Sequence, residues 1–244
     1  MPRKAFLLLT SALGWLGFVA VVLWTMAFLV RGVDGPHRSS CSWAVVVDLA
    51  LLFLFAAQHS VMARRPVKAW LRRRFPAALE RTTYVLATDV CLLLLLALWQ
   101  PFGGEVWHVR GPLAVVLWSL CAAGWVLAMA ATFAVDHLEL TGLRQTGWAG
   151  PRPSDDGLHV AGLHAVVRHP LMTGILLAFW ATPHMGASHL LFAVASTGYI
   201  AIGVQLEERD LRRTFGEAYD EYAARVPALL PGFPLARARR QAAH

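Results

Sequence analysis

The sequence predicts an all-α polytopic membrane helix bundle with five or six transmembrane helices, and three observations support this prediction. Only 15% of the 244 residues are charged, whereas soluble domains carry about 25%. Hydrophobic residues make up 57% of the chain and form long continuous blocks. The 22 Lys and Arg residues outnumber the 15 Asp and Glu residues, which gives a net charge of +7, and the basic residues gather in alternate loops. This composition excludes a disordered chain, a disulfide scaffold and a fibrous repeat, and it disfavours an ordinary water-soluble enzyme.

Four apolar blocks are each long enough for one transmembrane helix, because about 20 residues of helix cross the roughly 30 Å hydrocarbon layer. These blocks are 5–30, 43–62, 83–100 and 112–135. The first block is longer than the apolar core of about 7–15 residues that is typical of signal peptides, and no small-residue cleavage site follows it. We therefore expect it to be a retained helix.

A fifth apolar block, 171–205, is too long for one simple span. The run Pro-His-Met-Gly at 183–186 interrupts it, which predicts a hairpin of two helices over 171–182 and 187–206. The first of these helices is short for a span, so we expect the hairpin to tilt or to reach only part of the membrane depth. The prediction is six apolar helices, with five full spans as the alternative.

The distribution of basic residues predicts the orientation of the chain. Nineteen of the 22 Lys and Arg residues lie in the amino terminus, the 63–82 loop, the 136–169 loop and the carboxyl tail, which share one side of a six-helix protein. Because basic loops stay in the cytoplasm, we expect both termini on the cytoplasmic side of a bacterial inner membrane. The same residues are expected to contact anionic lipids.

The whole chain is predicted to form one membrane domain. Its parts are four amino-terminal spans (5–135), a cytoplasmic loop (136–170), the hairpin (171–206) and cytoplasmic lid helices (207–235). No nucleic-acid-binding motif is present, so the basic charge does not indicate a nucleic-acid partner, and no obligatory protein partner is evident. The three cysteines lie far apart without metal-ligand spacing, so neither a disulfide framework nor a metal site is predicted.

Ionisable residues within the apolar blocks are candidate functional groups, because burying them in a membrane is costly. His59 and Asp89 lie in neighbouring predicted helices of opposite direction, at a similar depth when about 1.5 Å is counted per residue. We expect them to pair, either as a polar contact that holds two helices together or as a general base with its orienting carboxylate. Asp48, near the outer end of its helix, is interpreted as an interfacial cap.

A second candidate base lies where the fourth predicted span ends. His137 stands between Asp136 and Glu139 at the expected cytoplasmic membrane surface, and an unperturbed imidazole titrates near neutral pH. The alternative interpretation is a helix end that carries interfacial charges and is terminated by Gly142.

The stretch from His164 to Gly174 carries the most informative pattern. Pro170 suits the first turn of a helix. Arg168 and His169 would then lie at the positive end of that helix, where an anionic group can bind. Gly174, one turn later, leaves room for a flat group against the helix. The alternative interpretation is a basic interfacial anchor.

The segment 203–227 predicts an amphipathic helix or a pair of helices, because its apolar residues recur at helical spacing. This apolar stripe consists of Leu211, Phe215, Tyr219 and Tyr222. The segment is expected either to lie on the membrane or to fold back as a lid over the cytoplasmic end of the bundle. The adjacent carboxylates of Glu207 and Glu208 are either solvated or placed to hold a cation or ribose hydroxyls.

These carboxyl-terminal motifs resemble those of the isoprenylcysteine carboxyl methyltransferase superfamily. The matching pattern is Arg-His-Pro-x-x-x-Gly, a hydrophobic hairpin, and then Glu-Glu-x-x-Leu-x-x-x-Phe-Gly-x-x-Tyr-x-x-Tyr with a closing proline. In that superfamily this half forms the S-adenosylmethionine site at the cytoplasmic membrane face. The resemblance therefore implies that S-adenosylmethionine is bound by His164, Val167, Arg168, His169, Pro170, Gly174, Glu207, Glu208, Tyr219 and Tyr222.

The amino-terminal half is similar to the NnrU-type branch of this superfamily. The matching runs are Gln-His-Ser-Val-Met-Ala-Arg at 58–64, Glu-Arg-Thr-Thr-Tyr at 80–84, Gly-Leu-Arg-Gln at 142–145 and Phe-Trp-Ala-Thr-Pro at 179–183. Within the branch, the whole chain most resembles the bacterial methanethiol S-methyltransferases. This resemblance implies S-adenosylmethionine-dependent methylation of methanethiol to dimethyl sulfide.

Methylation of a small thiol needs a base and a dry apolar pocket, because the thiolate is the reactive form and water around it lowers its reactivity. The expected pocket walls are Met172, Phe179 and Trp180. The candidates for the base and for its orienting carboxylate are His59, His137, Asp89, Asp136, Glu139 and Glu208. The sequence does not separate these candidates.

Two departures from the superfamily pattern bear on the ligands. Isoprenylcysteine enzymes carry an arginine about one turn before the paired glutamates, whereas this chain has Gly-Val-Gln at 203–205, which suits an acceptor without a carboxylate. A tyrosine common four residues before the motif arginine is His164 here. The alternative functions are methylation of a larger lipid-like thiol, carboxylate or amine, a membrane reductase and a transporter. No repeat-related pair of broken helices supports a transporter.

Overall fold

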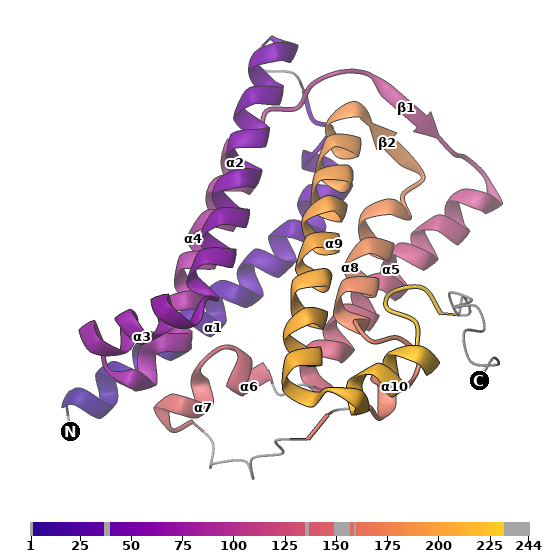
Figure 1. Ribbon diagram of the computed structural model, residues 1–244. Coiled ribbons are helices and arrows are strands. Elements are labelled where there is room, and N and C mark those ends of the chain that lie inside the picture. The colour runs from indigo at the N-terminus through magenta and orange to yellow at the C-terminus, as the bar shows by residue number, and fades with distance from the viewer. Residues whose placement is uncertain (1, 37–39, 135–136, 149–156, 159, 232–244) are drawn as a thin grey trace, which may run out of the picture. The chain divides into compact units, whose positions relative to one another are not determined.

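The computed structural model describes residues 2–36, 40–134, 137–148, 157–158 and 160–231, and most of these residues are helical (Figure 1). Five helical segments are long and apolar enough to cross a membrane. They are Lys4–Gly32, Cys41–Met62, Ala77–Leu98, Pro112–Ala134 and Ala187–Phe215. The predicted all-α polytopic membrane fold is therefore confirmed, and the chain is an integral membrane protein.

The amino-terminal elements follow the predicted apolar blocks. They are α1 (Pro2–Ala27) with a terminal π-helical turn η1 (Phe28–Gly32), α2 (Cys41–Met62), α3 (Arg65–Arg74), the 3-10 turn η2 (Ala77–Leu79) and α4 (Glu80–Leu98). Pro66 lies in the first turn of α3, where its missing N–H costs nothing. Pro76 follows α3 and cannot continue a helix, so the basic α3 is separated from the apolar α4.

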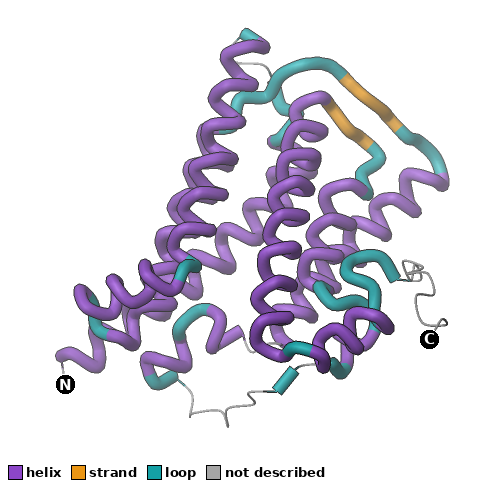
Figure 2. Tube along the Cα trace, viewed as in Figure 1, coloured by secondary structure: helices purple, strands orange, loops and turns teal. Residues whose placement is uncertain are grey.

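The remaining elements are β1 (Glu105–His108), α5 (Pro112–Ala134), α6 (His137–Leu140), α7 (Leu143–Thr146), η3 (Gly162–Ala165), α8 (Pro170–Trp180), β2 (His184–Gly186), α9 (Ala187–Phe215) and α10 (Glu217–Arg225). Figure 2 shows that β1 and β2 are the two strands among the described residues. They form an antiparallel ribbon that the sequence analysis did not predict. The ribbon is the one departure from an all-helical description of these residues.

The predicted hairpin exists, but its two helices differ greatly in length. α8 has 11 residues and rises about 16 Å, which is about half the hydrocarbon thickness. α9 has 29 residues and does not end near residue 206 as expected. No glycine or proline interrupts 207–215, and its residues are mostly good helix formers. The helix therefore ends only before Gly216, whose φ is +54°.

The chain packs into two compact units, and it passes between them several times. The first unit comprises 1–109, 134–153 and 183–196. Within it, α4 packs against both α1 and α2. Asp48 is fully buried and its Oδ1 accepts a hydrogen bond of 2.9 Å from the backbone N–H of Gln100. Asp48 thus binds the chain just after α4 from a buried position within α2, and is not the interfacial cap that was expected.

The second unit comprises 110–133, 154–182 and 197–244. Within it, α5 and α8 approach each other closely at two glycines. A Cβ atom placed on Gly174 would lie 2.6 Å from the backbone N of Ala128 and 2.6 Å from the carbonyl O of Gly124. Small residues that let two backbones approach in this way are typical of membrane helix contacts.

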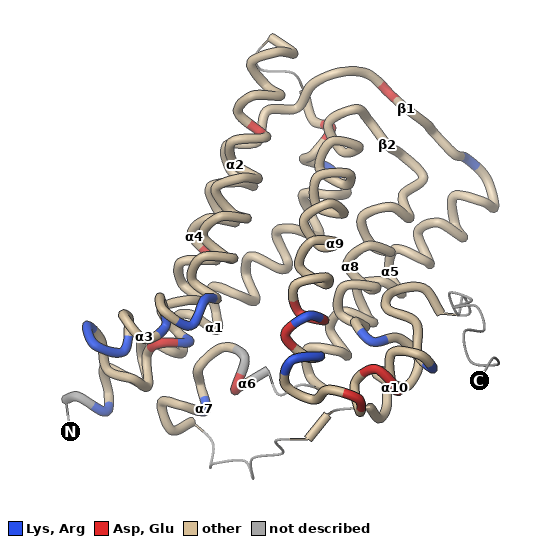
Figure 3. Tube along the Cα trace, viewed as in Figure 1, with Lys and Arg blue, Asp and Glu red and all other residues tan. Residues whose placement is uncertain are grey.

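Charged residues concentrate on α3, on the carboxyl-terminal part of α9 and on α10 (Figure 3). The apolar helices carry few of them, which explains the low overall charge of the sequence. The cytoplasmic location of both termini, the bacterial inner membrane and the anionic-lipid contacts stay predictions.

Candidate functional site

In the second unit, Arg168 lies at the centre of a buried network of charged groups. The residue stands just before α8, and its side chain is 10% exposed. Its Nε donates to Glu208 Oε1 at 2.9 Å, and its Nη2 lies 2.5 Å from the same oxygen. Its Nη1 donates to the carbonyl oxygens of Ala223, at 3.0 Å, and Val226. The guanidinium therefore links α9 to α10 by bonds of the strong, charge-assisted kind.

His169 stands between the two adjacent glutamates of α9. Its side chain is 6% exposed, with Nε2 3.3 Å from Glu208 Oε1 and Nδ1 3.4 Å from Glu207 Oε2. The side chain of Glu208 is 11% exposed, whereas that of Glu207 is 55% exposed. The network thus has a buried carboxylate that holds Arg168 and an open carboxylate at its edge, which solvent and ligands can reach.

The segment after α10 runs along the residues that precede α8. The backbone N–H groups of Arg168 and His169 donate to the carbonyl oxygens of Pro227 and Ala228, at 2.9 and 3.0 Å. Thr173 Oγ1 donates to Leu229 O at 2.7 Å. These bonds connect the end of the described chain to the start of α8, so the charged network is enclosed by backbone as well as by side chains.

The two tyrosines of α10 complete the network. The hydroxyl of Tyr222 donates to the carbonyl O of His164 at 2.6 Å, and the rings of Tyr219 and Tyr222 meet edge to face, 6.0 Å apart. Tyr219 is 1% exposed, and its hydroxyl has no hydrogen-bond partner among the described residues. Burial, together with the negative charge of Glu208, raises the pKa of Tyr219 to about 12. Tyr219 is therefore a neutral phenol at physiological pH.

The structure brings together most of the residues expected at the cofactor. Arg168 and His169 contact Glu207 and Glu208 directly, and Tyr222 reaches His164. Val167 is buried next to them in the chain, and Pro170 begins α8 as expected. Gly174 differs, because the space that its missing side chain leaves is filled by α5. The cofactor contacts of all these residues stay predictions.

The expected pocket walls lie along α8. Met172 and Phe179 are seven residues apart, which places them on one face of the helix. The buried ring of Phe179 meets Trp125 of α5 edge to face, with centroids 6.2 Å apart. Trp180 is 36% exposed, and its Nε1 donates to Thr197 Oγ1 at 2.9 Å. Trp125, which was not among the expected residues, thus lies against one of them, and the role of these side chains as pocket walls stays a prediction.

The expected pair of His59 and Asp89, in the first unit, does not form. The ring nitrogens of His59 lie 2.9 and 2.8 Å from the hydroxyl of Tyr84, and its ring stacks on Phe55. Asp89 Oδ2 is buried without a hydrogen-bond partner among the described residues, next to Gly17 of α1. The expectation that His59 and Asp89 lie at the same depth was wrong. His59 lies within about one turn of the end of α2, and Tyr84 within about one turn of the start of α4, whereas Asp89 lies more than one turn further along α4.

The other candidate base is only partly described. Asp136 lies outside the described residues, as does the side chain of His137, which begins α6. Glu139 also lies on α6, and its carbonyl O accepts the backbone N–H of Gly142 at 3.2 Å. Gly142 has a φ of +88°, which agrees with the helix end expected there. A catalytic role for His137 stays a prediction.

A comparison with known families and proteins gives the relationships of this chain. A family model described as "NnrU protein" matches residues 48–205. The chain belongs to the NnrU family. The expected NnrU-type branch is thereby confirmed, and the matched residues include the whole of α8 and the motif before it.

Several relatives of this NnrU-family chain are named methyltransferases. It is 44% identical over 231 residues to the methanethiol S-methyltransferase of Mycobacterium tuberculosis, with 93% of each chain covered. It is 46% identical over 204 residues to the methanethiol S-methyltransferase of Pseudomonas deceptionensis, covering 82% of this chain and 78% of that one. It is also 34% identical over 190 residues to Nurim of Rattus norvegicus, covering 73% and 71%. No solved structure matches.

Some contacts within each unit had no signal in the sequence. The acceptors of the Arg168 Nη1 group are backbone carbonyls of Ala223 and Val226, and any residue type can supply them. Tyr84 was visible within a matched run at 80–84, but nothing in that run indicated that it would contact His59.

Proposed function

We propose that this NnrU-family protein is a thiol S-methyltransferase that converts methanethiol to dimethyl sulfide with S-adenosylmethionine, at the cytoplasmic face of the membrane. The observation that carries the proposal is the identity of 44–46% to proteins named methanethiol S-methyltransferase over most of the chain. The charged network at the start of α8 supports it, since such a cluster in a largely apolar protein is a candidate binding site.

The residues of the network fit the chemistry of the proposed cofactor. S-adenosylmethionine supplies an electrophilic methyl group on a sulfonium, together with ribose hydroxyls and an amino-acid group. The exposed carboxylate of Glu207 suits hydroxyl and ammonium donors. The buried hydroxyl of Tyr219 has an unused hydrogen-bonding capacity, which buried polar groups rarely leave unfilled. Arg168 is already engaged by Glu208 and by α10, so its proposed role is to position Glu208 and the lid.

The proposed acceptor is small and apolar, so its binding requires shape and dryness rather than charge. Met172, Phe179 and Trp180 are the proposed walls, because α8 presents them next to the buried ring of Trp125. Excluding water from a thiolate raises its reactivity. Holding it in line with the methyl group provides several kcal/mol more. Methanethiol dissolves in lipid, so it can reach these walls through the bilayer.

The test of this proposal is product formation in cells and with purified protein. Cells that express the chain and receive methanethiol should release dimethyl sulfide into the headspace, above cells with an empty vector. Purified protein in detergent should form dimethyl sulfide only when S-adenosylmethionine is present. The absence of dimethyl sulfide in both assays, with folded protein, would exclude methanethiol as the acceptor. Product from a lipid-like thiol alone would favour the larger acceptor class.

The base is proposed to be His59 or His137, with Asp136 or Glu139 as the orienting carboxylate of His137. Glu208 is a further candidate for the base itself. We expect His59→Ala or His137→Ala to lower the turnover of methanethiol by about 100-fold or more, which is the usual contribution of a positioned base. Initial rates at saturating cofactor, with thermal unfolding as a check on folding, measure this. If both variants are folded and keep the wild-type rate, neither histidine is the base.

A further inference from the structure

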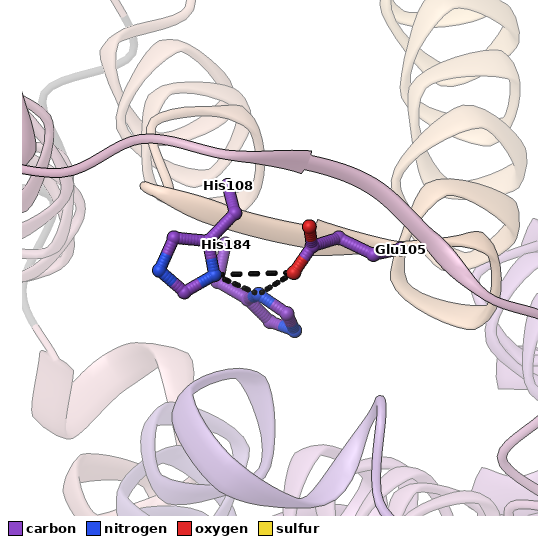
Figure 4. A group of neighbouring side chains, drawn as sticks. All are labelled: Glu105, His108 and His184. Atoms are coloured by element: carbon purple, nitrogen blue, oxygen red, sulfur yellow. Dashed lines mark hydrogen bonds and ion pairs between the residues drawn. The ribbon is translucent and has the colours of Figure 1, made fainter.

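A cluster of metal-ligating side chains lies on the β1–β2 ribbon. The ribbon contains none of the residues discussed as a site so far. Its members are Glu105, His108 and His184 (Figure 4). His108 Nδ1 lies 3.1 Å from Glu105 Oε2, and His184 Nδ1 lies 3.5 Å from the same oxygen. The two Nδ1 atoms are 3.3 Å apart. Three ligand atoms therefore converge on one point.

The ribbon itself explains why these side chains converge. His108 and His184 are direct partners in the antiparallel register, so their side chains lie on the same face. Glu105 precedes His108 by three positions, and in a regular strand it would point to the opposite face. A register shift between Glu105 and Trp107 inserts one extra residue in β1. Such a bulge re-aims the following side chains, and here it brings Glu105 to the face of the histidines.

The backbone around the cluster is held in place from several sides. Val109 N donates to Pro183 O at 2.7 Å, and Ala187 N donates to Gly104 O at 2.9 Å. The carboxylate of Asp34 accepts the backbone N–H of Gly186 at 2.8 Å and that of His189 at 2.9 Å. These bonds fix both strands at their ends. The ligand atoms are therefore presented by a preorganised support and not by a free loop.

We propose that Glu105, His108 and His184 bind one divalent transition-metal ion of the zinc type. In a tetrahedral zinc site with bonds of about 2.0–2.1 Å, neighbouring ligand atoms are about 3.3 Å apart. The three distances here are 3.1, 3.3 and 3.5 Å, which match one triangular face of that tetrahedron. Two imidazoles and one carboxylate are a usual zinc ligand set, with water in the fourth position.

The chemistry of the ligands also narrows the choice of ion. Imidazole nitrogen favours zinc, copper and nickel, whereas calcium and magnesium prefer sites made of oxygen ligands. The side chains are 38%, 48% and 53% exposed for His108, His184 and Glu105, so an ion can enter from solvent. The bound ion would connect positions that are 76 residues apart in the chain. It would thereby stabilise the folded protein against the unfolded chain.

A zinc titration of the full-length protein tests the site. The protein is purified in detergent with a tag that contains no histidine, is treated with a chelator, and is then titrated with zinc chloride in a calorimeter. We expect the wild type to bind one equivalent of zinc that the double variant His108→Ala/His184→Ala does not bind. Zinc should raise the unfolding temperature of the wild type and leave that of the double variant unchanged. Glu221→Gln, which removes an exposed carboxylate on α10, should bind zinc like the wild type.

A milder variant and a chemical probe keep the test decisive if the double variant fails to fold. Glu105→Gln should weaken zinc binding by at least about tenfold, since even the partners of metal ligands contribute that much. In the wild type, zinc should protect His108 and His184 from modification by diethyl pyrocarbonate, as read by peptide mass spectrometry. Equal zinc binding by the wild type and a folded cluster variant overturns the proposal. Modification of both histidines at the same rate with and without zinc also overturns it.

Discussion

Arg168→Ala is expected to abolish most of the methyl transfer activity and to destabilise the protein. The variant leaves Glu208 buried beside His169 without its main cation. Breaking a buried ion pair by removing one partner costs about 3–5 kcal/mol. The variant also releases the end of α10, since the guanidinium binds the carbonyl of Ala223 in its last turn and that of Val226 just after it. Misplacement of a binding group by about 1 Å lowers rates by about 100-fold, so we expect a loss of at least that size.

Three measurements separate a role in the site from a role in folding alone. The unfolding temperature in detergent reports stability, calorimetry reports the affinity for S-adenosylmethionine, and headspace analysis reports turnover. Arg168→Lys keeps the positive charge but lacks the planar set of donors that a guanidinium presents. It should therefore be more stable than Arg168→Ala and less stable than the wild type. The matched control is Arg209→Ala on α9, because the side chain of Arg209 is exposed and its loss should change little. Unchanged cofactor affinity in a folded Arg168→Ala variant would contradict the placement of the site.

Gly174→Ala is expected to lower stability, although the same change usually favours a helix. A Cβ atom at this position would lie 2.6 Å from backbone atoms of Ala128 and Gly124, which cannot move as a flexible side chain can. The two helices would have to separate, and overpacking of this kind typically costs about 1–3 kcal/mol. The unfolding temperature in detergent should therefore fall.

The matched control for this variant is Gly198→Ala on α9. A Cβ atom there meets no other atom within 4 Å, so the change should stabilise the helix by up to about 1 kcal/mol. The opposite signs of the two effects make the comparison informative. If both variants unfold at higher temperature than the wild type, the close contact between α5 and α8 is wrong. If the Gly174→Ala variant is as stable as the wild type but binds the cofactor less well, Gly174 leaves room for the cofactor, as the sequence first suggested.

The spans could be predicted from sequence because length and apolarity alone decide which segments cross a membrane. The clustering of Arg168 and His169 with Glu208 could be anticipated from the motif pattern. Charged residues at the ends of apolar helices avoid the hydrocarbon interior and therefore pair with one another. The hydrogen-bond partner of His59 could not be predicted from the sequence. Choosing between Tyr84 and Asp89 requires the helix ends to within one turn, and sequence blocks do not define ends so finely.

The cluster of Glu105, His108 and His184 was hidden for a different reason. Its spacing of three residues and then 76 matches no local metal-binding pattern. It depends on a strand pair and on a bulge within an otherwise helical protein, and neither has a signal in hydrophobic periodicity. No metal site was expected from the sequence, because the expectation rested on the cysteines alone, and these lie far apart.

The hydrogen bonds from Arg168 to the end of α10 have a consequence for biosynthesis. The chain is made from its amino terminus, and the Val226 carbonyl is synthesised 58 residues after Arg168. By then every segment long enough to cross the membrane has been translated. Insertion of the helices and completion of the charged network are thus separate events, and the second waits for the last turn of the final helix. A chain that ends after α9 would contain all five of the candidate spans but would lack two of the acceptors of Arg168.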